Sequence, residues 1–507
     1  QFEILFFIKE GMAALETWAL LLAVFSLLYI YNRWKHSFWA RQGVPSAPAI
    51  PFLGHTHKLV KDKYLYNDEV YKKYGGSYLS GCYEFLSPVL VVGDPELINH
   101  ILIKDFAHFQ NHPKIYYKKQ DPIMSNNIFV IQDDAWKKLR TIVSPSFSSG
   151  MLKATFPLLL EQADHLAQYC MKSSEEKNKE LDVMEIFGAF ALDSVASVFF
   201  GFEADSLENK DSAFIKAVGE IFDFTAMDQL RVTLVKSMPK SVIDFFGLYT
   251  IDSDKECFRI LTKIVQDVLN TRRKGLKRGD FLDNMLEAQV KDPETVTDVC
   301  IASQSIDFLT AGIDTTQITS SFAAYYLAKH PEYQARIRKE LLEKIAEHGG
   351  FNYHAVNDCK LLDACISESM RITPAITTFI DRECNKKYTI PNTSVVVPEG
   401  ALVMVPVYSL HHDARYWPEP EEFRPERFMP ENKDQIIPNT FFPFGGGPRI
   451  CIASRFAKLQ MRCALARILQ NMELKLVPGK EKLRIKSTFF GLMPDDFSLL
   501  ITPINEE

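Results

Sequence analysis

The feature that most constrains this chain is a short loop ending in a cysteine, FGGGPRICIA at residues 444–453. Its three consecutive glycines have no Cβ, so the backbone there can approach something bulky. Cys451 stands at or just before SRFAKLQMRCALARIL, an apolar stretch that reads as a helix. A helix N-terminus carries partial positive charge and free N–H donors, which lower a thiol pKa and favour metal binding. The loop therefore predicts a cradle for a thiolate.

Two other interpretations compete for this loop. A lone cysteine near a helix is usually a small buried hydrophobe. Glycine-rich loops also bind phosphates or dinucleotides, but here Ile450 occupies the third glycine position and no Lys-Ser or Lys-Thr follows. The flanking residues do not read as a βαβ unit either, which argues against a phosphate loop.

The full stretch resembles the haem-binding signature F-x-x-G-x-R-x-C-x-G of the cytochrome P450 superfamily. Phe444, Gly447, Arg449 and Cys451 match it, whereas Ala453 stands where glycine is usual. The resemblance implies haem b with Cys451 as the iron ligand, and we expect Ala453 to alter porphyrin packing slightly without preventing haem binding. The residues expected to bind the cofactor, with those of the motifs below, are Cys451, Arg449, Phe444, Gly445, Trp136, Arg140, Arg382 and Ala311.

A second motif, AGIDTT at residues 311–316, lies inside a helix predicted over residues 292–329. Asp292 is a good N-cap, and the His330-Pro331 pair ends the pattern. Glycine and hydroxyl residues are unfavourable inside a helix, and a rule broken there indicates function. The motif resembles the superfamily's oxygen-binding segment, which implies that Asp314 and Thr315 are catalytic and guide water and protons. The alternative is a core helix kinked by glycine.

Two further motifs gain meaning from the same resemblance. Trp136 and Arg140 in WKKLR face the same side of a helix and match the W-x-x-x-R that contacts a haem propionate, as Arg382 and Arg449 would. The neighbouring Lys137 and Lys138 predict part of a basic docking patch for a reductase, although a solvated charged face would look the same. The E-x-x-R motif of Glu368 and Arg371, with Arg427 of PERF, implies a buried structural triad.

The N-terminal region predicts a membrane anchor. Residues 13–31 are apolar over about 28 Å of helix, close to one bilayer core. Arg33, Lys35 and Arg41 follow, which places the remainder in the cytosol by the positive-inside rule. No cleavage site precedes the charged run, so a signal peptide is the weaker interpretation. We expect upstream residues at 1–11 with Met12 as a natural start, an anchor at 12–32, a basic and proline-rich linker at 33–54, and a catalytic domain at 55–507.

Composition excludes several other functions. The net charge of −6 argues against nucleic-acid binding, and nine cysteines without CxxC pairs indicate a reduced, cytosol-facing protein. The substrate pocket is expected in scattered segments, with Phe308, Ala375, Ile376, Phe379, Phe489 and Phe490 as candidates. The predicted fold is mainly α with small β-sheets, the cytochrome P450 fold, with one N-terminal transmembrane helix.

The resemblance implies a monooxygenase of the endoplasmic reticulum membrane, similar to the drug-metabolising and detoxifying members of vertebrates and insects. NADPH–cytochrome P450 reductase would supply electrons, with cytochrome b5 as a second candidate donor, and membrane lipid would surround the anchor. The substrate would be a small apolar molecule: a xenobiotic, a steroid or a fatty acid. Two alternatives stay open, an isomerase or dehydratase of the same fold acting on a peroxide, and a haem-binding sensor without turnover.

Overall fold

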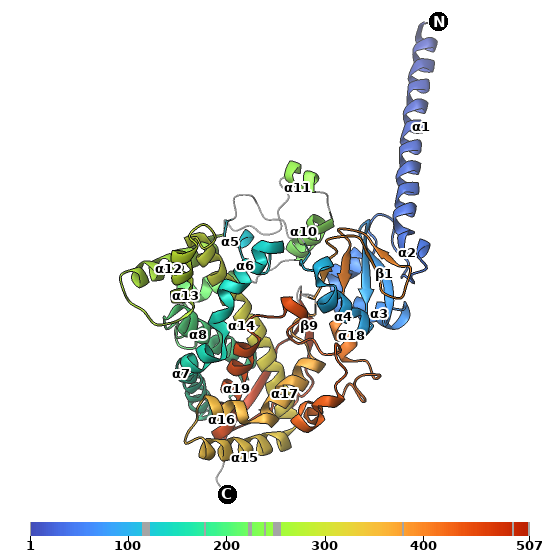
Figure 1. Cartoon of the computed structure of the whole chain (residues 1–507). Helices are drawn as coiled ribbons and strands as arrows, with labels where there is room; N and C mark the ends of the chain where they lie inside the picture. The colour runs from blue at the N-terminus through green and yellow to red at the C-terminus, as the bar shows by residue number, and fades with distance from the viewer. Residues whose placement is uncertain are drawn as a thin grey trace.

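The computed structural model describes residues 2–113, 122–176, 179–221, 226–237, 240–246, 255–377, 380–488 and 491–504. A helical body lies beside a smaller region that contains the four-stranded sheet, and α1 extends away from the molecule on the sheet side (Figure 1). The predicted fold class, mainly α with small sheets, is confirmed. The α-helices are α1 (Phe2–His36), α2 (Phe38–Arg41), α3 (Thr56–Lys73), α4 (Pro95–Asn99), α5 (Pro122–Ser125), α6 (Asp133–Val143), α7 (Ser149–Ser174), α8 (Val183–Val195), α9 (Ala213–Ile221), α10 (Ala226–Ser237), α11 (Lys240–Phe246), α12 (Glu256–Arg273), α13 (Phe281–Lys291), α14 (Asp298–Lys329), α15 (Pro331–Glu347), α16 (Tyr353–Asp358), α17 (Lys360–Ile372), α18 (Val407–His411) and α19 (Ser454–Asn471).

Short helical turns connect several of these elements. Two are π-helical, η1 (His100–Lys104) and η4 (Ala196–Phe200). The others are 3₁₀ turns, namely η2 (Phe106–His108), η3 (Ser144–Phe147), η5 (Pro425–Phe428), η6 (Pro430–Gln435) and η7 (Gly447–Arg449).

The strands form small sheets rather than one large one. The largest has the order β1-β2-β7-β4, in which β2 and β7 are parallel and the other pairs are antiparallel. A three-stranded sheet has the order β3-β11-β8, and β5-β6 and β9-β10 are hairpin-like pairs. The strands are β1 (Leu79–Glu84), β2 (Ser87–Val92), β3 (Leu181–Asp182), β4 (Arg382–Glu383), β5 (Tyr388–Thr389), β6 (Val396–Val397), β7 (Leu402–Met404), β8 (Met472–Leu476), β9 (Ile485–Ser487), β10 (Leu492–Pro494) and β11 (Ser498–Pro503).

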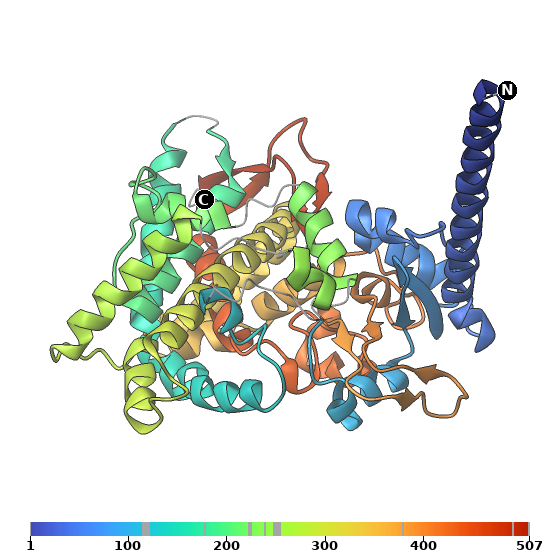
Figure 2. The same ribbon diagram turned by 90° about the horizontal axis from the view of Figure 1, so that it is seen from above.

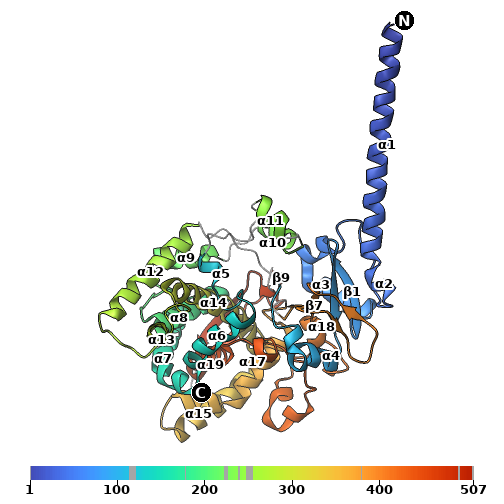
Figure 3. The same cartoon turned by 45° about the horizontal axis from the view of Figure 1, so that its top comes forward.

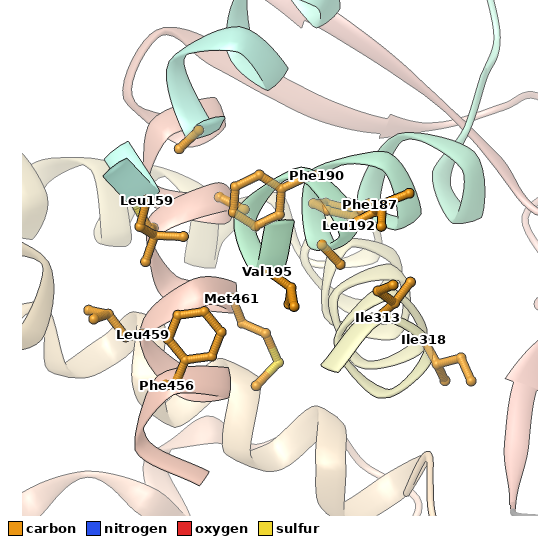
Figure 4. Close-up of a cluster of buried hydrophobic side chains, with 14 of the residues drawn as sticks. Leu159, Phe187, Phe190, Leu192, Val195, Ile313, Ile318, Phe456, Leu459 and Met461 are labelled. Atoms are coloured by element: carbon orange, nitrogen blue, oxygen red, sulfur yellow. The ribbon is translucent and has the colours of Figure 1, made fainter. Parts of the chain in front are cut away.

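The long helix α14 runs through the centre of the helical body. Most of its side chains are buried, and it packs against α8, α17 and α19. Figure 4 shows buried side chains of α8, α14 and α19 converging in one apolar cluster. Burying a large apolar side chain contributes roughly 1.5–3 kcal/mol. This packing holds α14 in a fixed position relative to α19, the helix that follows the cysteine loop.

The start of α14 differs from the prediction. The helix begins at Asp298, because Thr297 is its N-cap and accepts a hydrogen bond from the Cys300 backbone N–H. Asp292, the predicted N-cap, instead ends α13, and residues 293–296 form a turn. The predicted end of the helix before His330 is confirmed. Asp292 does not begin α14 because its backbone N–H closes α13 by donating to the Ala288 carbonyl, and Thr297 caps α14 five positions later.

α1 contains a span that is long and apolar enough to cross a membrane. This span, Leu15–His36, has a mean hydropathy of 1.4 and is almost entirely exposed. α1 stands clear of the body when the molecule is viewed from above (Figure 2). The apolar helix of residues 183–200 passes the same test, but it is mostly buried in the core.

The segment after α1 packs tightly onto the sheet. Trp39 is fully buried, and its indole N–H donates to the Cys82 carbonyl at 3.1 Å. A Cβ built on Gly81 would lie 2.2 Å from the Trp39 ring, so only glycine fits at that position. This contact fixes where α1 leaves the catalytic body.

Candidate active site

The cysteine loop is held by its own backbone hydrogen bonds. Cys451 lies three residues before α19 begins, and its N–H donates to the Phe444 carbonyl at 2.9 Å. The thiol opens into the internal cavity. Burial among protein atoms raises its pKa, whereas the Ala453 backbone N–H and the charge of Arg140 act in the opposite direction. A metal ion bound there would deprotonate the thiol outright.

The glycines of the loop serve two different purposes. A Cβ on Gly447 would lie 1.9 Å from the Leu102 carbonyl, and Gly447 has a φ of 67°, so the loop can pack against η1 only with glycine there. Gly445 also has positive φ, but no protein atom would meet its Cβ, and it lines the cavity. The glycine that permits a close backbone approach is therefore Gly447, and its neighbour there is another part of the protein. Gly445 instead faces the open space of the cavity.

Ala453, where the signature has glycine, is the N-cap of α19. Its φ of −93° and ψ of 11° are accessible to any residue, so its methyl group causes no backbone strain. Ala453 is half-buried and lines the cavity.

Three arginines converge on one side of the cavity. Burial, together with the neighbouring charges of Arg382 and Arg140, lowers the pKa of Arg449 to about 9. Burial likewise lowers the pKa of Arg382 to about 10. Such a concentration of buried positive charge is costly unless an anion accompanies it. The cavity therefore favours a ligand that carries negative charge on this side.

Two side chains of the WKKLR motif, Trp136 and Arg140, pack against this cationic side of the cavity. The Arg449 guanidinium lies over the Trp136 ring, 3.9 Å from its centroid, and Trp136 also contacts Phe106. Arg449 donates to the carbonyls of Gln110 and Ile131, and Arg140 donates to the Ile450 carbonyl at 2.8 Å. Trp136, Arg140, Arg382 and Arg449, the residues predicted to contact the cofactor's propionates, all line the cavity.

The AGIDTT segment of α14 also lines the cavity. The Thr315 hydroxyl donates to the Ala311 carbonyl at 2.8 Å, a local bond that competes with the regular helix pattern. The Thr316 hydroxyl donates to the Gln460 Oε1 atom of α19 at 3.2 Å, and Gln460 in turn donates to the Ala191 carbonyl. These bonds connect the segment directly to the helix that follows Cys451.

Two carboxyl groups on α14 lie in the cavity wall. Burial raises the pKa of Asp314 to about 7, and it raises the pKa of Asp307 to about 7 as well. A carboxyl group with a pKa near 7 can both release and accept a proton at neutral pH. Asp314 was predicted from its motif, whereas Asp307 was not singled out.

The three residues of the predicted triad lie together; Glu368 and Arg371 are fully buried, and Arg427 is partly buried. Arg371 makes a bidentate pair with Glu368 at 2.8 and 2.9 Å, and Arg427 Nε lies 3.3 Å from Glu368 Oε1. Arg371 also donates to the His411 carbonyl, and the His411 ring accepts from the Phe442 backbone N–H at 2.9 Å. The triad is therefore hydrogen-bonded, through His411, to the start of the cysteine loop.

The cavity has a volume of about 1260 Å³. Of the predicted substrate contacts, Phe308, Ala375 and Ile376 line it. Phe308 also packs edge-on against Phe147 and Phe281. Three further candidates, Phe379, Phe489 and Phe490, lie outside the described residues.

Haem fits this arrangement. It is a large apolar ring with two propionates and an iron atom that accepts a thiolate. The cavity supplies a cysteine thiol, open space above Gly445, and three converging guanidinium groups. Cys451 would hold the iron, and Arg140, Arg382 and Arg449 would neutralise the propionates.

Comparison with known proteins decides the family. The cytochrome P450 family model matches residues 44–501, which is most of the chain. The chain belongs to the cytochrome P450 family. It is similar to cytochrome P450 3A5 of Homo sapiens, 34% identical over 498 residues, which cover 96% of each chain. Cytochrome P450 3A11 of Mus musculus is 34% identical over 511 residues, again 96% of each chain, and cytochrome P450 3A9 of Rattus norvegicus is 34% identical over 516 residues, 97% of each.

Family membership, predicted from the motifs, is thereby confirmed, and with it the assignment as a cytochrome P450 monooxygenase. The family implies haem iron as the cofactor. Sequence reasoning missed the contributions of His411, Gln460 and Asp307. Asp307 could have been found, because it is an acidic residue four positions before Ala311 and therefore on the same face of the helix.

Proposed function

We propose that this cytochrome P450 is a membrane-anchored monooxygenase that inserts one oxygen atom of O₂ into a small apolar molecule, using NADPH electrons from a reductase. The observation that carries the proposal is that one cavity joins a cysteine thiol, a cationic side and the AGIDTT face of α14. The lining also includes apolar side chains such as Phe308, Ala375 and Ile376. Such a cavity suits a cofactor and an apolar substrate held next to each other.

The protein's own residues have separate tasks in this scheme. When bound, haem ligated by a thiolate supplies oxygen activation, because the thiolate pushes electron density that favours O–O cleavage. Cys451 provides that thiolate, and the arginines orient the ring. Asp314 exchanges protons with water in the cavity, and the Thr315 hydroxyl holds a proton at the cavity surface of α14. The surrounding apolar side chains exclude bulk water and orient the substrate.

Two exposed phenylalanines favour a second membrane contact. Phe245 and Phe246 of α11 are 82% and 66% exposed. α10 and α11 lie at the end of the body toward which α1 extends (Figure 3). With α1 spanning a bilayer, α11 would meet the same surface, and the catalytic body would face the cytosol of the endoplasmic reticulum membrane.

Each of the two lysines proposed to bind the reductase is paired with an acidic side chain, which reduces the net positive charge of the patch. Lys137 pairs with Asp134 at 3.0 Å, and Lys138 pairs with Asp292 at 2.6 Å. Both lysines are exposed, so they remain available to an acidic partner such as the reductase, with cytochrome b5 as a second donor. Replacing both with glutamate should weaken reductase binding, and an unchanged apparent affinity would remove them from the patch.

A reconstituted system tests the proposed function. The full chain, in lipid with NADPH–cytochrome P450 reductase, should consume NADPH and O₂ and hydroxylate an apolar probe such as a steroid. Thr315→Ala should lower product formed per NADPH several-fold and raise peroxide release. Thr271→Ala is the matched control, because Thr271 makes the same bond to the carbonyl four residues earlier, on α12 far from the cavity. Turnover without NADPH would favour an isomerase, and no electron uptake would favour a sensor.

A further inference from the structure

Asp307 is an acidic side chain of the cavity wall to which the proposed chemistry gives no task. It stands on α14 one turn before Ala311, so both face the same side of the helix. Asp307 lines the cavity, and its charge is near enough to Cys451 to raise the pKa of that thiol. The carboxyl group therefore borders the same cavity as the thiol.

The Asp307 carboxylate has no protein partner among the described residues. Within the described ranges its carboxylate forms no ion pair, and the one side-chain hydrogen bond at this residue goes from the Thr310 hydroxyl to the Asp307 backbone carbonyl. Asp193, a buried acid on α8, instead accepts hydrogen bonds from the Ser206 hydroxyl and backbone N–H. Burial alone raises the pKa of Asp307 to about 7, and no opposing charge lowers it.

The arginines of the cationic side make contacts other than an ion pair with Asp307. Arg449 donates to backbone carbonyls and stacks on Trp136, and Arg140 donates to the Ile450 carbonyl. A carboxylate in an apolar wall is costly unless a ligand brings a donor or a positive charge. A ligand in the cavity can supply the polar partner that Asp307 does not have in the protein.

We infer that the Asp307 carboxylate recognises a basic nitrogen, and that the cavity takes apolar amines whose ammonium group donates to Asp307. This inference rests on the proposed function, because it names a substrate class for the same cavity. Holding the nitrogen at one point of the wall would also limit which carbon atoms reach the reacting centre. A neutral substrate of the same shape would gain nothing from Asp307.

The probe pair is benzyldimethylamine and isobutylbenzene, which have the same shape and differ by one nitrogen that is protonated at neutral pH. Binding to the haem-loaded full chain is measured by equilibrium dialysis, which does not depend on turnover. Asp307→Asn keeps the side-chain shape and removes the charge. Asp307→Glu keeps the charge, and Glu220→Gln removes a carboxylate from an exposed position at the cavity lining as the matched control.

We expect Asp307→Asn to weaken amine binding by about tenfold or more, since hydrogen bonds between charged groups are the strong ones. Isobutylbenzene should bind all proteins within about twofold, and Asp307→Glu should retain the preference for the amine. Equal loss of both probes, no loss of either, or the same loss in Glu220→Gln would overturn the inference. The reduced carbon monoxide spectrum of each protein is recorded separately, so a failed haem site is distinguished from a failed amine site.

Discussion

The triad and the cavity wall bury charged groups in opposite ways. The Glu368 and Arg371 side chains are completely buried, and each makes several hydrogen bonds, including the bidentate pair between them. Asp307 and Asp314 are also enclosed, but burial is the only influence on their pKa values. The charges of Glu368 and Arg371 neutralise each other within the protein. The carboxyl groups of Asp307 and Asp314 are left to interact with molecules that enter the cavity.

This difference separates structural from functional polar groups. A satisfied buried pair holds elements together, here α17 with the segment around η5, and connects them to the cysteine loop through His411. A charged carboxyl group that lines a cavity without a protein partner lowers stability, and such groups cluster at functional sites. The comparison therefore predicts that removing the first kind destabilises the fold, whereas removing the second kind stabilises it and impairs function.

The largest expected effect comes from the triad. Glu368→Ala leaves Arg371 buried without its partner, which should lower the free energy of unfolding by about 3–5 kcal/mol. Because Arg371 also holds His411, haem should dissociate more readily. Urea unfolding and haem retention measure both effects. Arg336→Ala, which breaks an exposed pair with Glu426, is the control and should cost less than about 1 kcal/mol; equal effects would contradict the structural role of the triad.

Asp314 is expected to affect catalysis more than stability. Asp314→Asn cannot release a proton, so turnover should fall by about tenfold to a hundredfold, near the lower range for a lost general acid. Because the pKa of Asp314 is about 7, the turnover of the native enzyme should change with pH around that value. The variant should show a flatter pH profile. A profile that is unchanged in shape would assign the proton transfer to another group.

Replacing Asp307 should change the stability of the fold by a smaller amount, and it should raise the stability instead of lowering it. Its pKa of about 7 in the folded protein lies above the ordinary value of 3.8, so the folded state binds the proton more tightly than the unfolded state. Stability from this group is therefore lost as pH rises from about 4 to about 7. Asp307→Asn should match the native protein near pH 4 and exceed it by roughly 1–3 kcal/mol above about pH 7. Thermal unfolding across pH measures this difference, and destabilisation at high pH would show that Asp307 is satisfied after all.

The smallest effect is expected at Ala453. Its backbone angles do not require glycine, so Ala453→Gly should change stability by less than about 1 kcal/mol. Haem content and the absorption spectrum should stay the same. A large gain in haem content with glycine would show that the methyl group of Ala453 interferes with the porphyrin.

The sequence predicted the motifs well because each depends on local spacing. Glu368 and Arg371 are three residues apart on one helix, and Cys451, Gly447 and Arg449 lie in one loop, so their proximity follows from the chain itself. Fold class and family followed from the order of these motifs. The triad's third member, Arg427, came from the family resemblance and not from spacing.

The features that sequence reasoning missed depend on distant contacts. The bond from His411 to Phe442 joins residues 31 positions apart, and that from Thr316 to Gln460 joins residues 144 apart. Neither has a local pattern. The start of α14 was wrong for another reason: Asp292 and Thr297 are both good caps, and only the end of α13 determines which one is used.

The measurement that tests the central claim most directly is the absorption spectrum of the reduced protein with carbon monoxide, for the native chain and for Cys451→Ser. We predict a Soret band strongly red-shifted to the position typical of thiolate-ligated haem, which Cys451→Ser abolishes. A band at the histidine-ligated position, or a thiolate band that survives Cys451→Ser, would contradict the assignment of Cys451 as the iron ligand.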